Sequence, residues 1–115
     1  MTSLEDLKVA VLKFAKDREW EPFHTPKNLS TAIAVEAAEL QELFMWLTPE
    51  QSQHASPELK AKIVDEVGDV LICLINFAAS VGIDPVAAAA QKILKNNQKY
   101  PVEKSRGSAK KYDEI

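Results

Sequence analysis

Two stretches of fifteen residues decide the fold: IAVEAAELQELFMWL at residues 33–47 and IVDEVGDVLICLINF at residues 63–77. In each stretch apolar residues recur every three or four positions, which is the spacing that lines one face of an α-helix. Each also holds two carboxylates three residues apart, Glu36 with Glu39 and Glu66 with Asp69. Residues at this spacing are neighbours on a helix. Both stretches are therefore predicted to be helices with an acidic pair beside the apolar stripe.

The two stretches also match each other in phase, so that Glu36 corresponds to Glu66 and Glu39 to Asp69. If the helices pack antiparallel along their stripes, the four carboxylates converge at one seam. Like charges held together and partly desolvated need a cation between them. Ligand sets made only of oxygen favour a hard cation, so we expect Mg²⁺, with Mn²⁺ as the second choice. The alternative is that the four carboxylates are ordinary surface charges. Because the two pairs stand at the same phase of their helices, this is the weaker interpretation.

Composition is that of a globular protein of one domain, predicted to span residues 1–115. The 115 residues carry a net charge of −3, which gives no reason to expect a nucleic-acid partner. Cys73 is the single cysteine and lies in an apolar pattern, which favours a reducing cytoplasmic setting. The N-terminus does not read as a signal peptide, and the run from Val70 to Val81 is too short to cross a bilayer. We therefore expect no membrane partner.

The rest of the N-terminal half predicts one further helix and a loop. A helix is expected from residue 4 to about residue 18, capped by Thr2 or Ser3. Residues 19–29 read as an irregular loop whose aromatic side chains either plug the core or line a pocket. The first acidic helix is then expected to begin at a cap at Asn28 or Ser30 and to run to Leu47.

The second half predicts two more helices and a tail. After a polar connection over residues 48–56, the second acidic helix is expected from 57 to about 80, with Ser56 as its cap. It is apolar nearly all round, which indicates a subunit interface. Asp84 caps a helix from 85 to about 99. Residues 101–115 form a basic tail without apolar periodicity, for which disorder is the ordinary expectation. No β-strand pattern occurs, so the class is all-α.

Basic and aromatic side chains suggest what the acidic seam binds. Lys92 and Asn96 are four residues apart and share a helix face, which suits contacts to phosphate oxygens beside Mg²⁺. Trp20 and Trp46 could stack on a flat ring, although a tryptophan on a helix is more often part of the core. Metal, phosphate donors and stacking aromatics together favour a nucleoside triphosphate.

The acidic signature, with its flanks, resembles that of a known superfamily. Glu36-x-x-Glu39 followed by Glu66-x-x-Asp69 is similar to the signature of the all-α nucleoside triphosphate pyrophosphohydrolases, the MazG-like superfamily. Flanking segments look like its dCTP pyrophosphatase branch: Arg18-Glu-Trp20, Phe23-His24-x-Pro26-x-Asn28-Leu29, Asp69-Val-Leu-Ile and Tyr100-Pro-Val. The resemblance covers residues 4 to 112.

The resemblance implies a four-helix-bundle-type fold, assembled as a homotetramer from two dimers. It implies Mg²⁺-dependent hydrolysis of a (deoxy)nucleoside triphosphate, most plainly dCTP or a modified cytidine or pyrimidine, to the monophosphate and pyrophosphate. The four acids of the signature would hold the metal, and Glu36 or Glu39 would activate water. The implied substrate-binding residues are Trp20, His24, Asn28, Trp46, Lys92, Asn96 and Tyr100.

Two departures leave the preferred base and sugar open. Close members of the branch have His at the position of Val11 and Tyr at that of Cys73. Two alternative functions also remain. A pyrophosphohydrolase acting on dUTP or phosphoribosyl-ATP would keep the four acids but differ in the pocket. A catalytically silent helical interaction module would bind a cation only for structure.

Overall fold

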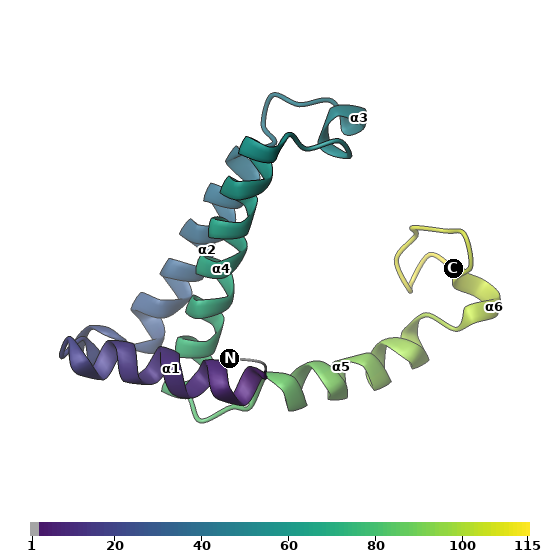
Figure 1. The fold of residues 1–115 in the computed structure, drawn as a ribbon. Coiled ribbons are helices and arrows are strands. Elements are labelled where there is room, and N and C mark those ends of the chain that lie inside the picture. The colour runs from purple at the N-terminus through teal and green to yellow at the C-terminus, as the bar shows by residue number, and fades with distance from the viewer. Residues whose placement is uncertain (1–2) are drawn as a thin grey trace. The chain divides into compact units, whose positions relative to one another are not determined.

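A computed structural model describes residues 3–115, and every regular element in this range is a helix (Figure 1). The predicted all-α class is therefore confirmed. The chain divides into two compact units, one ending at Gly82 and the other spanning Ile83–Ile115. The first unit holds α1 (Leu4–Asp17), a 3-10 turn η1 (Glu21–Phe23), α2 (Pro26–Glu42), α3 (Pro49–Ser52) and α4 (Pro57–Ser80). The second holds α5 (Pro85–Lys99) and α6 (Val102–Ser105).

The two acidic helices form the body of the first unit. Figure 1 shows α2 and α4 side by side and antiparallel, joined at one end by the segment that contains α3. At the other end α1 crosses them and contacts α4. The antiparallel pairing expected from the two matched stretches is thus present, and it places the middle of α2 beside the middle of α4.

Side-chain caps fix where the longer helices begin. The Ser3 hydroxyl accepts a hydrogen bond from the Asp6 backbone N–H at 3.0 Å, and the alternative cap at Thr2 lies outside the described residues. Ser56 caps α4 by accepting from the Leu59 N–H at 3.1 Å, and Asp84 caps α5. Each cap satisfies a backbone N–H that has no partner inside its helix. These predicted starts are confirmed.

The predicted bounds of the first acidic helix are wrong at both ends. It begins at Pro26, because the Thr25 hydroxyl accepts from the Asn28 N–H at 3.2 Å and proline suits the first helical position. It ends at Glu42, and residues 43–46 form turns instead of continuing to Leu47. The predicted loop over 19–29 is shorter as a result and includes η1.

Two segments expected to be irregular contain short helices. Within the polar connection 48–56, Thr48 and Gln51 form a reciprocal capping box that starts α3. Within the basic tail, α6 follows Pro101, and the Tyr112 ring lies edge-to-face on the Tyr100 ring with 6.1 Å between centroids. The tail is therefore folded against the end of α5 within the second unit, rather than lacking structure as its composition suggested.

The buried core of the described chain is small and lies where α1, α2 and α4 meet. The buried side chains are Val11, Ala15, Leu29, Ile75 and Ala78. The apolar stripes of α2 and α4 are only half-buried over much of their length, and Val67 and Leu74 are exposed. The end of the first unit where α1 crosses α2 and α4 is thus better packed than the part beside the acidic pairs.

No single helix within residues 3–115 has the length and apolar character needed to cross a membrane. The consecutive helices α4 and α5 meet that test only when taken together, on length and composition alone.

Candidate active site

Three of the four predicted carboxylates meet between α2 and α4. Oxygen atoms of Glu36, Glu39 and Glu66 all lie within 4.8 Å of one another. Asp69 is close enough that its negative charge raises the pKa of both Glu36 and Glu66. The antiparallel packing brings these side chains together because each pair stands at the same phase of its helix, beside the stripe that faces the partner helix.

The electrostatics of this carboxylate cluster, Glu36, Glu39, Glu66 and Asp69, favour a proton or a cation. A hydrogen bond shared with Glu39 raises the pKa of Glu36 to about 7, with burial and the charges of Glu39, Asp69 and Glu66 adding to the effect. Burial is the first cause of the raised pKa of Glu66, and the charges of Glu39 and Asp69 follow. A cation among these oxygens would remove the same repulsion.

The donor set fits a hard divalent metal ion. The Oε2 atoms of Glu36 and Glu66 are buried and have no hydrogen-bond partner among residues 3–115. A buried carboxylate oxygen without a partner is costly, so such atoms call for an explanation, and an ion is one. Carboxylate oxygens are the ligands that Mg²⁺ and Mn²⁺ prefer. The cluster therefore has the chemistry of a metal site.

A cavity of about 440 Å³ lies next to the cluster and is walled by α1, η1, α2 and α4. Cys73 connects the two: it lines the cavity, and its thiol pKa is raised first by burial and then by the charges of Glu36 and Asp69. Most of the lining is apolar, including Val11, Leu29 and Ile72. A small organic group attached to metal-bound phosphates could therefore enter the cavity directly from the cluster.

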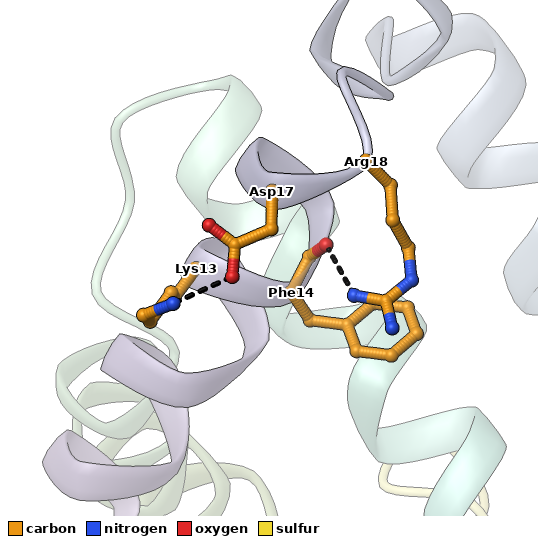
Figure 2. A network of polar contacts seen from close by, with 4 residues as sticks. All are labelled: Lys13, Phe14, Asp17 and Arg18. Carbon is orange, nitrogen blue, oxygen red and sulfur yellow. Dashed lines mark hydrogen bonds and ion pairs between the residues drawn. The ribbon is translucent and has the colours of Figure 1, made fainter.

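Stacked side chains from α1 and η1 build one wall of this cavity. The Phe14 and Trp20 rings meet edge-to-face at 5.7 Å between centroids, and Trp20 meets the His24 ring in the same way at 6.4 Å. Figure 2 shows the Arg18 guanidinium over the Phe14 ring, with its carbon 3.5 Å from the ring centroid. Its Nη1 also donates to the Phe14 carbonyl oxygen at 3.1 Å. The loop aromatics thus line a pocket.

A salt bridge fixes the same end of α1. Lys13 donates to the Asp17 carboxylate one turn away, and Figure 2 shows this pair on the side of the helix opposite Arg18. The hydrogen bond from Lys13 is the largest influence on the pKa of Asp17 and lowers it. Burial opposes this effect, and the positive charges of Lys13, Arg18 and Lys16 each lower the pKa by less. Pairs at this spacing stabilise a helix modestly.

The structure places the remaining predicted residues in three different situations. Trp20, His24 and Asn28 line the cavity, and the Asn28 amide nitrogen donates to the Phe23 carbonyl oxygen at 2.9 Å. Trp46 follows the C-terminal end of α2, does not line this cavity and is 88% exposed. Lys92, Asn96 and Tyr100 belong to the second unit, at α5 and its end.

Most of the residues that line the cavity were not among the predicted substrate-binding residues, and Phe14 and Asn76 are two of them. Phe14 belongs to the apolar spacing of its helix, and Asn76 interrupts an apolar run on the side of the helix that carries Glu66 and Asp69. The position of Asn76 in the sequence could have indicated its place in the site, because it lies on the same side of its helix as Asp69 and Cys73. The sequence gives no such indication for Phe14, because an apolar residue on a helix stripe looks the same whether it faces a core or a pocket.

The chain is similar to known proteins along most of its length. A sequence model of the MazG-like family matches residues 31–115, which include the carboxylate cluster. The chain is similar to dCTP pyrophosphatase 1 of Rattus norvegicus, at 41% identity over 98% of this chain and 68% of the rat protein. It is likewise similar to dCTP pyrophosphatase 1 of Homo sapiens, at 39% identity and the same coverage.

A solved structure has the same fold. The crystal structure of a pyrophosphatase from Archaeoglobus fulgidus superposes with a TM-score of 0.81 at 35% sequence identity. The match covers 85% of this chain and 92% of the archaeal one.

Proposed function

The chain belongs to the MazG-like family, and on that premise we propose that it is a nucleoside triphosphate pyrophosphohydrolase that uses Mg²⁺ and acts on dCTP or a modified cytidine or pyrimidine analogue. The products are the nucleoside monophosphate and pyrophosphate. The named relatives are dCTP pyrophosphatases. The observation that carries the proposal is the adjacency of a carboxylate cluster and an apolar cavity through Cys73. This arrangement suits a ligand with a polyphosphate at one end and a base at the other.

In this proposal the four carboxylates Glu36, Glu39, Glu66 and Asp69 hold Mg²⁺, with Mn²⁺ as a substitute. Bound there, the metal supplies charge neutralisation and orientation of the phosphates. Glu36 or Glu39 orients the attacking water and accepts its proton, the general-base role open to a carboxylate within reach of that water. The apolar lining excludes bulk water from the nucleoside, which strengthens the electrostatic contacts to the substrate.

The remaining substrate contacts are assigned by residue type. Trp20 offers an aromatic face to the base, while His24 and Asn28 stand beside it on the cavity wall. Lys92 and Asn96 in the second unit are assigned to the phosphates, and Tyr100 is assigned to substrate binding without a more specific role. Trp46 is assigned to the base pocket of another copy, because its ring is 88% exposed in its own chain. The proposed assembly is accordingly a homotetramer, a dimer of dimers.

The proposal also places the enzyme in the nucleotide pool of the cytoplasm, acting on free nucleotides rather than on nucleic acid. This setting is proposed from the net charge of −3 and the single cysteine. We also propose that residues 1–115 form one domain.

The experiment that tests the proposal measures pyrophosphate release from ribo-, deoxy- and 5-modified nucleoside triphosphates, with Mg²⁺ and with EDTA. We expect release that requires metal and is strongest for dCTP or a modified cytidine. Glu39→Gln and Asp69→Asn should each lower kcat/KM by more than about 100-fold, beyond the loss typical of residues that only support a metal ligand. Glu42→Gln, an exposed acid on the same helix outside the cluster, should leave kcat/KM unchanged.

Other outcomes identify the alternatives. Strongest release from dUTP or phosphoribosyl-ATP would keep the chemistry and change the substrate. No release from any nucleotide, with metal raising only the melting temperature, would favour the interaction module.

A further inference from the structure

A second cavity of about 360 Å³ adjoins the first, and the two share Ala15, His24 and Asn76. Asn76 comes from α4, and His24 follows η1. A residue that lines both cavities stands where they join. A group that fills the first cavity therefore meets Asn76 at the junction with the second cavity.

The amide of Asn76 is free for a ligand. Other polar side chains nearby already serve the backbone: Asn28 donates to the Phe23 carbonyl oxygen at 2.9 Å, and Ser80 donates to the Phe77 carbonyl oxygen at 2.7 Å. Asn76 makes no such hydrogen bond to any residue from 3 to 115, although it is half-buried. An amide that has no partner in the protein and is not sealed from water can exchange its water contacts for hydrogen bonds to a ligand.

The position of Asn76 along α4 matches the direction of the proposed substrate. Asp69, Cys73 and Asn76 are spaced i, i+4 and i+7, so they share one face of the helix. Asp69 stands at the carboxylate cluster, and seven residues of helix carry Asn76 about 10 Å further along the axis. A triphosphate held at the cluster therefore directs its sugar past Cys73 and its base toward Asn76.

The chemistry of the amide completes the argument. A carboxamide presents one acceptor and one donor side by side, and it can pair with an acceptor and a donor that are adjacent on a base. Cytosine has such an edge, formed by its exocyclic amino group and the neighbouring ring nitrogen. Most other lining groups of the first cavity are apolar or aromatic, and they offer surface rather than directional contacts.

From these observations we propose that Asn76 is a specificity-determining residue, whose side-chain amide pairs with the hydrogen-bonding edge of the base. The inference rests on the proposed function and adds to it the group that reads the base. Trp20 then supplies stacking that any base would satisfy, whereas Asn76 supplies the contact that depends on which base is present.

The test compares nucleotides with a substrate that has no base. KM and kcat are measured for dCTP and for base-free 2-deoxyribose 5-triphosphate, with the wild type, Asn76→Leu and Asn76→Ala. We expect both variants to raise KM for dCTP by about 5- to 100-fold, the range that one bidentate pair contributes. KM for the base-free triphosphate should not change, and kcat should change by less than KM. Ser80→Ala, four residues further along α4, is the matched control and should leave both substrates unaffected.

The outcomes separate the inference from the proposed function. If the wild type releases pyrophosphate but the variants keep the wild-type KM for dCTP, the assignment of Asn76 is wrong. It is equally wrong if KM rises as much for the base-free triphosphate, because that result indicates a purely structural role. If the wild type hydrolyses no triphosphate at all, the proposed function fails and the inference fails with it. Asn76→Ala only removes atoms, so it keeps the test valid if Asn76→Leu does not fold.

Discussion

Among the residues of the site, Glu36 has the carboxyl group whose charge depends most on whether a metal ion is bound. Its pKa is about 7 rather than the ordinary 4.5, first because it shares a hydrogen bond with Glu39 and then because of burial and neighbouring negative charge. In the metal-free protein, Glu36 therefore binds a proton at a pH where the unfolded chain has lost it. Protonation and metal binding relieve the same repulsion, so they compete.

This competition predicts how stability varies with pH. The folded state holds more protons than the unfolded state between about pH 4.5 and 7, so the free energy of unfolding should fall as pH rises through this window. In EDTA, we expect a lower melting temperature at pH 8 than at pH 5.5. Added Mg²⁺ should raise the melting temperature more at pH 8, because binding there displaces fewer protons.

Glu36→Gln is the control for this pH dependence, since glutamine has no proton to lose. Its melting temperature in EDTA should change less between the two pH values than that of the wild type. A wild-type melting temperature that stays level or rises from pH 5.5 to pH 8, relative to Glu36→Gln, would contradict the interpretation.

At the level of elements, α4 spans both parts of the site, because Glu66 and Asp69 at the cluster and Cys73 and Asn76 at the cavity all project from it. Its start is fixed by the Ser56 hydroxyl, which accepts from the Leu59 N–H, and by Pro57 at the first helical position. The 24 residues from Pro57 to Ser80 contain no further proline, so the helix runs unbroken from its cap past the cluster to the cavity. A change at the cap therefore alters stability without altering the chemistry.

Replacing the cap gives a prediction for this element. Ser56→Ala should lower the free energy of unfolding by about 1 kcal/mol, the usual cost of a lost cap, while Ser56→Asp should keep it near the wild-type value. Urea denaturation followed by circular dichroism measures both. Equal stability of the alanine and aspartate variants would mean that the Ser56 hydrogen bond contributes nothing.

The sequence predicted the elements that have strong local signals. Ser56-Pro57 and Asp84-Pro85 each combine a cap with a proline, and both helices begin where these pairs indicate. The start of α2 was missed because Thr25 competed with Asn28 and Ser30 as a cap, and only Thr25 precedes a proline. The convergence of the acids was predictable because it depends on helix phase. The cavity was not, because its wall depends on how residues 19–25 fold over α1.

At the scale of the whole molecule, the described chain buries too little apolar surface to be complete by itself. A chain of this length is expected to bury about two-thirds of the surface that its unfolded form exposes. Here the core is five side chains, whereas large apolar side chains such as Val64, at 62% exposed, and Leu94, at 67%, face outward. So many large exposed apolar side chains, on each of the two units taken by itself, indicate surfaces that another molecule covers.

A charge on this surface should therefore disrupt the assembly. We expect the wild type to sediment as an oligomer, a homotetramer under the proposal, and Val64→Glu to sediment as a smaller species, because an interface tolerates an unpaired buried charge poorly. Lys62→Glu, two residues away and also exposed, is the control and should keep the wild-type mass. A wild type that is monomeric at micromolar concentration would contradict the proposed assembly.

The separation of the two tryptophans provides an optical means to follow the site and the assembly independently. Trp20 lines the cavity, whereas Trp46 lies beyond the far end of α2 and is 88% exposed. Trp46→Phe leaves an emission signal that depends on what enters the cavity. Trp20→Phe leaves the emission of Trp46, which depends on whether another molecule covers the end of α2. Nucleotide titration should therefore shift the first spectrum, while dilution should shift the second toward longer wavelength.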